Sequence, residues 1–176
     1  LYTQPIDDVL RKYMDALDRI FYERDERDFW SLDTWEDTLA DAEMYEDSFT
    51  RHEGNMTFYF GKMVVVDTEK HAERYQGLDW LAFLEALVHV ARLKEFPTRK
   101  RLEELECGDI VDYALRIRSE GLIWVDLLTG ESTPPPSAAT TPLENCAFQL
   151  DCCLHMYCFF LDKKFGANDE RVTEFG

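Results

Sequence analysis

Two short stretches of similar sequence recur 46 residues apart, and this recurrence constrains the fold more than any other feature. The first is Leu-Asp-Thr-Trp at residues 32–35, and the second is Leu-Asp-Trp-Leu at residues 78–81. Each stretch follows a charged loop and begins a segment in which apolar side chains recur at helical spacing. The recurrence predicts two units of helix, loop, short extended segment and helix.

The helices of these units are predicted from apolar periodicity and capping residues. Apolar side chains recur every three or four positions over residues 6–21, which predicts an amphipathic helix. Asp33 offers an N-cap, with Glu36 three positions later, for a second helix. Between residues 46 and 55 the pattern fades, and a third helix is predicted over residues 56–66. Asp79 caps the fourth and clearest helix.

The rest of the chain predicts two short helices, a linker and a long last helix. Thr98 and Asp109 are the caps of the short helices, and the first domain, residues 1–128, ends after them. Residues 129–142 contain three consecutive prolines and small polar residues, which is typical of an extended linker. An apolar docking helix is expected over residues 143–165 and a polar tail over residues 166–176. The predicted fold class is therefore all-α.

The last predicted helix is apolar over more than half of its circumference. Leu150, Leu154, Tyr157 and Leu161 recur at steps of three and four, with further apolar side chains beside them. The polar side chains within residues 143–165 make it a poor membrane span. We therefore expect this helix to dock on the preceding domain or on another protein.

Composition excludes some partners and indicates a compartment. The chain has 36 acidic and 19 basic side chains and a formal net charge of −17, so it repels nucleic-acid phosphates and anionic lipid surfaces. No start Met, signal peptide or run of 18 apolar residues is present, and the five cysteines suit reduced thiols. We expect these residues to form part of a longer cytoplasmic protein that binds neither nucleic acid nor membrane.

Catalytic and metal-binding patterns are weak. Cys152, His155 and Cys158 lie three residues apart and offer soft ligands, but no second Cys/His cluster completes a tetrahedral site. Core packing is the alternative interpretation of these side chains. Neither Cys107 nor Cys153 lies in an activating sequence context, and no phosphate-binding loop or nucleophile elbow occurs. The sequence therefore predicts a protein that is not an enzyme.

Residues 6–93 resemble a pair of EF-hands, the helix–loop–helix units of the calmodulin-like fold. The resemblance implies that the two loops meet through a short pair of strands. Residues 77–91, followed by Phe96 and Pro97, also look like the EF-hand-like modules of flagellar and ciliary proteins that have lost their calcium sites. The resemblance therefore implies a structural protein of the microtubule-based cytoskeleton, cilium or flagellum.

Calcium binding is expected to be weak or absent. With Leu32 at the apolar eighth position of the loop, Asp25 stands at position 1 and Glu36 at position 12, but Arg27 and Phe29 occupy two ligand positions. In the second loop Ala82 replaces the bidentate Glu of position 12. No cofactor is predicted, and a weak calcium sensor that uses Asp25 and Glu36 remains the alternative.

The predicted function is non-catalytic protein interaction. A paired-helix scaffold without calcium ligands still offers an apolar groove that receives an amphipathic helix. The occupant is either the chain's own helix at residues 143–165 or a helix of a cytoskeletal partner. The residues predicted for the groove or the core are Trp35, Leu39, Trp80, Phe83, Leu84 and Leu87.

Overall fold

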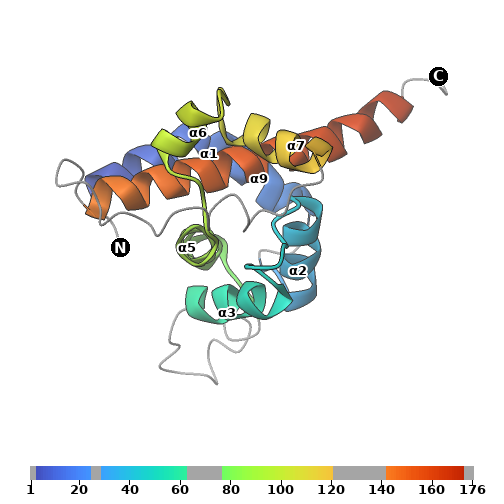
Figure 1. Cartoon of the computed structure of the whole chain (residues 1–176). Coiled ribbons are helices and arrows are strands. Elements are labelled where there is room, and N and C mark those ends of the chain that lie inside the picture. Colours follow the sequence, from blue (N-terminus) through green and yellow to red (C-terminus); the bar gives the residue numbers. More distant parts are fainter. Residues whose placement is uncertain (1–2, 25–28, 63–76, 121–141, 173–176) are drawn as a thin grey trace.

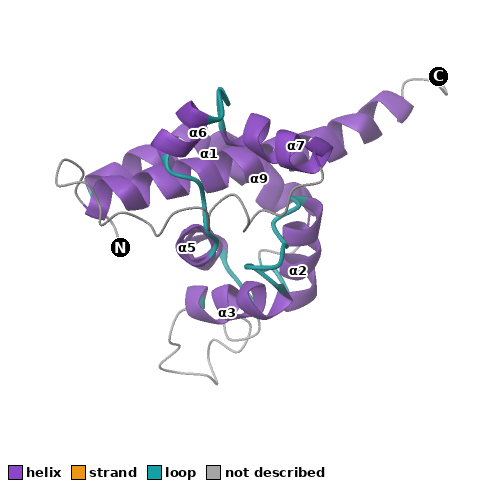
Figure 2. Cartoon of the chain, viewed as in Figure 1, coloured by secondary structure: helices purple, strands orange, loops and turns teal. Residues whose placement is uncertain are grey.

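The computed structural model describes residues 3–24, 29–62, 77–120 and 142–172, and these residues form helices joined by loops, without strands (Figure 2). The prediction of an all-α fold is thereby confirmed for this part of the chain. The helices are α1 (Gln4–Arg24), α2 (Leu32–Asp41), α3 (Arg51–Gly61), α5 (Trp80–Leu93), α6 (Arg99–Glu104), α7 (Ile110–Glu120) and α9 (Pro142–Val172).

The two longest helices, α1 and α9, lie side by side, and α5 crosses beneath them (Figure 1). Helix α3 packs on the far side of α5, and α2 packs against α3 and also reaches α9. Figure 1 shows that the C-terminal end of α9 extends beyond the other helices. The fold therefore places α5 at the centre, between the α1/α9 layer and α3.

An antiparallel bridge between described residues joins the loop before α2 to the loop before α5. The backbone amides of Trp30 and Leu78 each donate to the other residue's carbonyl oxygen, with both distances 2.9 Å. The next residue in each segment caps the helix that follows: Ser31 Oγ accepts from Thr34 N at 3.1 Å, and Asp79 Oδ1 accepts from Ala82 N at 2.9 Å. Residues 48 positions apart in the sequence are therefore structurally equivalent in the two segments.

This register corrects two predictions. The cap of α2 is Ser31 and not Asp33, because Ser31 follows the bridged Trp30 directly and its hydroxyl reaches the third amide of the helix. The sequence similarity aligns residue 32 with residue 78, whereas the bridge pairs Trp30 with Leu78, so the similar stretches differ from the structural alignment by two residues. The predicted caps Asp79, Thr98 and Asp109 are confirmed by side-chain hydrogen bonds to the first turns of their helices.

An aromatic cluster surrounds the bridged residue Trp30. The ring of Trp30 stacks on Phe21 of α1 with centroids 5.4 Å apart and lies 4.8 Å from Phe83 of α5. Both buried indoles satisfy their N–H groups, because Trp30 donates to Phe21 O and Trp35 donates to Gly54 O, each at 3.0 Å. The cluster joins α1, α2, α3 and α5 into one core.

Helix α3 begins earlier than predicted. The prediction placed it at residues 56–66, whereas it spans Arg51–Gly61 and starts with a capping box between Thr50 and Glu53. A Cβ atom on Gly61 would lie 2.6 Å from the carbonyl oxygen of Ala82 and 2.8 Å from Cβ of Ala86. Glycine therefore permits α3 to approach α5 closely at this position.

The last helix is longer than predicted. Helix α9 spans Pro142–Val172, so the first seven residues of the predicted polar tail continue the helix. The predicted linker at residues 129–142 lies outside the described residues except for Pro142 itself, which is the first residue of α9.

Candidate functional site: the groove that holds helix α9

Four apolar side chains of α9 are buried by the chain's own helices. Leu154, Tyr157 and Leu161 are fully buried, and Leu150 is 1% exposed. Helix α9 makes its most extensive contacts with α1 and α5, and further contacts with α7 and α2. These four residues are the ones that the sequence predicts for the docking face, and in the structure the face is covered within one chain.

Two ion pairs hold α9 against α1 along its length. Lys12 Nζ lies 2.8 Å from Asp151 Oδ1, and Tyr13 Oη donates to the same oxygen at 2.9 Å. Arg19, two turns further along α1, pairs with Asp162, three turns further along α9. The order of these contacts shows that α1 and α9 run in the same direction. The pairs set the register between two faces whose apolar contacts are less directional.

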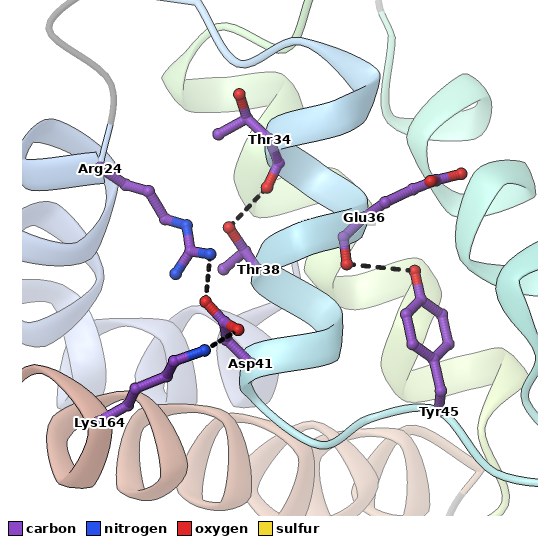
Figure 3. A network of polar contacts seen from close by, with 7 residues as sticks. All are labelled: Arg24, Thr34, Glu36, Thr38, Asp41, Tyr45 and Lys164. Carbon is purple, nitrogen blue, oxygen red and sulfur yellow. Dashed lines mark hydrogen bonds and ion pairs between the residues drawn. The ribbon is translucent and has the colours of Figure 1, made fainter.

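A third polar contact joins three helices at the far end of the groove. The carboxylate of Asp41 on α2 accepts hydrogen bonds from Arg24 of α1 and Lys164 of α9 (Figure 3). Burial alone would raise the pKa of Asp41, but these two cations lower it below its ordinary value. Asp41 is therefore held as a carboxylate, and its charge is used to position α9.

Two hydrogen bonds between uncharged groups support α2 (Figure 3). Thr38 Oγ1 donates to Thr34 O at 2.6 Å, and Tyr45 Oη lies 3.5 Å from Glu36 O, to which it donates. Burial raises the pKa of Tyr45 to about 12, so this phenol stays protonated as a donor. These contacts support the helix that carries Asp41.

The predicted groove residues lie in or beside the core. Trp35, Leu39, Phe83 and Leu87 are fully buried, Leu84 is 6% exposed, and Trp80 is partly buried against the core. Trp35 and Phe83 belong to the aromatic cluster, with their centroids 6.1 Å apart. Apolar periodicity marks a buried face, but it does not tell which of several helices will cover that face.

The predicted calcium ligands are only partly described. Asp25 lies outside the described residues. Glu36 lies on α2, and its carboxylate is 3.7 Å from Arg51 Nη1 of α3. Among the described residues, no three His, Cys, Asp or Glu side chains gather in a way that could hold a metal ion.

The cysteines of α9 are core residues. Cys152 and Cys158 are 5% and 7% exposed, and burial raises the pKa of each thiol to about 12. Cys153 is fully buried, and burial raises the pKa of its thiol further. His155 is partly exposed, with Nε2 3.9 Å from Asp109 Oδ2 of the α7 cap. Thiols held protonated in this way are poor nucleophiles and poor metal ligands.

The polar residues that fix α9 are absent from the sequence-based predictions. A signal for them exists on α1, where Lys12 and Arg19 are seven residues apart and so lie on one edge of the helix. Their partners Asp151 and Asp162 are eleven residues apart, which also places them on one edge of α9. Matching such edges requires knowing that the two helices are neighbours, which the sequence does not state.

No protein-family model, curated protein or solved structure matches the chain. Within the described residues, no helix has both the length and the apolar character that crossing a membrane requires.

Proposed function

We propose that the chain is a non-catalytic interaction module whose groove between α1 and α5 receives an amphipathic helix without needing calcium. The observation that carries the proposal is the complete burial of Leu150, Leu154, Tyr157 and Leu161 of α9 against α1 and α5. Recognition of a helix by such a groove uses anchors spaced three and four residues apart, which is the spacing of these four residues. In the resting state α9 is the occupant, and a partner helix with the same pattern competes for its place.

The order of the described helices α1, α2, α3 and α5 supports an EF-hand-like scaffold as part of this proposal. Helices α1 and α2 form one helix–loop–helix unit, and α3 and α5 form the other. The bridge between Trp30 and Leu78 joins their loops in the way that the two strands of an EF-hand pair meet. The matching caps Ser31 and Asp79, one residue after the bridge in each unit, support the same equivalence.

The register of the bridge supports independence from calcium. If Trp30 and Leu78 each occupy the eighth position of a loop, the twelfth positions are Thr34 and Ala82. Neither residue supplies the bidentate carboxylate on which calcium binding by such loops depends. Glu36 lies two residues beyond that position and faces Arg51.

The cellular setting in this proposal is the microtubule-based cytoskeleton, including cilia and flagella, and it rests on the sequence resemblance alone. A tagged full-length protein that decorates microtubule structures in cells would support this setting. A tagged protein that is distributed evenly through the cytoplasm would count against it.

The groove can be tested by cutting the chain while both parts are present. A protease site placed within residues 129–141 separates α9 from the rest without altering a described residue. We expect the fragment that carries α9 to stay bound on size exclusion, with equal affinity in excess calcium and in chelator. Leu154→Asp should release it, because the substitution places a charge in the buried contact.

Phe159→Asp is the matched control, since it makes the same kind of change at a residue of α9 that is 37% exposed. We expect this variant to keep the fragments together. Fragments that separate in the unsubstituted protein would contradict the groove. Association that strengthens tenfold or more on adding calcium would favour the weak calcium sensor instead.

A further inference from the structure

A pocket of about 260 Å³ lies where the N-terminal parts of α1 and α9 meet the C-terminal end of α5. Its apolar walls are Ile6 of α1, Val88 and Ala91 of α5, and Leu150 of α9. The volume is just under the range of about 300–1,000 Å³ typical of ligand pockets, so it suits a small ligand. The pocket does not contain any of the ion pairs that fix α9.

Two polar side chains in the pocket wall have no partner in the described part of the chain. The hydroxyl oxygen of Thr3 is buried and makes no hydrogen bond there. Arg92 lines the pocket and is exposed, and its guanidinium makes no ion pair or hydrogen bond with any described residue. By contrast, Arg11, Arg19 and Arg24 are each paired with an aspartate. An exposed cation without an ion-pair partner, beside an apolar cavity, is complementary to an anionic group on an apolar body.

Helix dipoles do not decide this preference. Helices α1 and α9 run in parallel and turn their N-terminal, positive ends toward the pocket, whereas α5 turns its C-terminal, negative end toward it. Charges more than about 8–10 Å from the pocket are screened at physiological salt. Most of the repulsion that the net charge of −17 would exert on an anion is therefore limited to acidic groups within that distance. The local groups therefore decide which ligand the pocket prefers.

We propose that this pocket binds a small apolar carboxylate of the fatty-acid type. The carboxylate accepts hydrogen bonds from the exposed Arg92, and the alkyl chain lies among Ile6, Val88 and Leu150. Such a ligand contacts α1, α5 and α9 together. It therefore strengthens the docking of α9, a consequence that rests on the function proposed above.

The test is a calorimetric titration of the full chain with octanoate, with 1-octanol as the uncharged probe of the same length. We expect saturable octanoate binding with Kd below about 1 mM and octanol binding at least about tenfold weaker, because octanol lacks the charge-assisted hydrogen bonds. Arg92→Gln should weaken octanoate about tenfold and leave octanol unchanged. Lys100→Gln removes the same charge from an exposed helix face outside the pocket and should change neither affinity.

A second variant tests the cavity itself. Cys146 is a half-buried wall residue, and Cys146→Phe fills the space, so binding of both probes should be lost while circular dichroism shows a folded chain. Absence of saturable octanoate binding would overturn the proposal, as would equal affinity for octanol or an Arg92→Gln variant that binds like the original chain. The cut-chain experiment contains no ligand, so failure of the groove and failure of this pocket are distinguishable.

Discussion

The buried tyrosine of α9 lacks a hydrogen-bond partner among the described residues. Tyr157 is fully buried, and no donor or acceptor in that part of the chain reaches its Oη. Burial raises the pKa of this phenol well above its ordinary value, so the group stays neutral. An unsatisfied buried hydroxyl opposes folding, whereas its ring contributes fully to the core.

Two Tyr→Phe substitutions on facing helices should therefore have opposite effects. Tyr157→Phe removes an unsatisfied hydroxyl and should raise the free energy of unfolding by about 1 kcal/mol. Tyr13→Phe removes the hydrogen bond to Asp151 and should lower it by about 1 kcal/mol. Urea unfolding of both variants gives the comparison. A loss of stability in Tyr157→Phe would show that its hydroxyl has a partner, such as a buried water.

A buried lysine fixes the segment between α2 and α3 to the end of α5. The side chain of Lys94 is 1% exposed, and its Nζ lies 2.5 Å from Glu46 Oε1 and donates to Met44 O at 3.1 Å. The ring centroids of Phe49 and Phe96 each lie 5.9 Å from Nζ. Burial lowers the pKa of Lys94 and raises that of Glu46. The ion pair is therefore maintained against a desolvation cost.

Removing one partner of this ion pair should cost more stability than removing both. Lys94→Met leaves the carboxylate of Glu46 without its buried partner and should cost about 3 kcal/mol of stability. The double variant Lys94→Met/Glu46→Gln should recover a large part of that loss, because no charge remains to be desolvated. Thermal and urea unfolding of the two single variants and the double variant measure the coupling between the two residues. Additive effects of the two substitutions would contradict the coupling.

Among the contacts between helices, the one at Asp41 should make the packing of α9 depend on pH. Its pKa is lower in the folded protein than in the unfolded chain, so its contribution to stability is fully present above the unfolded value of about 3.9. That contribution is lost as pH falls through the lower, folded pKa. Asp41→Asn should cost about 1–2 kcal/mol at neutral pH and reduce the loss of stability on acidification.

The measurement is the free energy of unfolding by urea at several values between pH 7 and pH 3. Asp162→Asn is a suitable comparison, since its pair with Arg19 is half exposed and should contribute less. If Asp41→Asn and the unsubstituted chain lose stability in parallel as pH falls, the proposed role of the Asp41 carboxylate is wrong.

Helices with a strong local signal are predictable from the sequence, and their tertiary register is not. Helix α5 combines an Asp79 cap with a dense apolar stripe, and both are seen in the structure. Ser31 and Asp33 are equally good caps by composition, and the bridge of Trp30 to Leu78 decides between them. The start of α3 is hard to predict because Gly54 and Asn55 favour helices poorly, although Thr50 and Glu53 form a capping box.

At the candidate site, the apolar anchors of α9 can be predicted from the sequence, whereas its polar contacts cannot. The anchors of α9 follow from periodicity along one segment, and all four are buried. The contacts that orient α9 join residues more than 120 positions apart, such as Lys12 with Asp151 and Asp41 with Lys164. Pairing of that kind depends on which helices become neighbours, and it leaves no local pattern in the sequence.

At the scale of the whole molecule, the scarce basic side chains are used to join helices. The chain has 19 basic against 36 acidic residues. Several of the basic residues connect different helices: Lys12, Arg19, Arg24 and Lys164 all take part in fixing α9 or its neighbours. These contacts offset part of the self-repulsion that so large a net charge imposes on a compact state.

In the function proposed above, the chain's own α9 occupies the groove and does so without calcium. Hydrogen exchange of the intact chain, followed by mass spectrometry in chelator and in excess calcium, tests this occupancy. We predict that amides of residues 150–161 are protected as strongly as those of residues 82–91, to the same extent in both conditions. Exchange of residues 150–161 at the rate of an unfolded peptide, or protection that appears only with calcium, would contradict the claim.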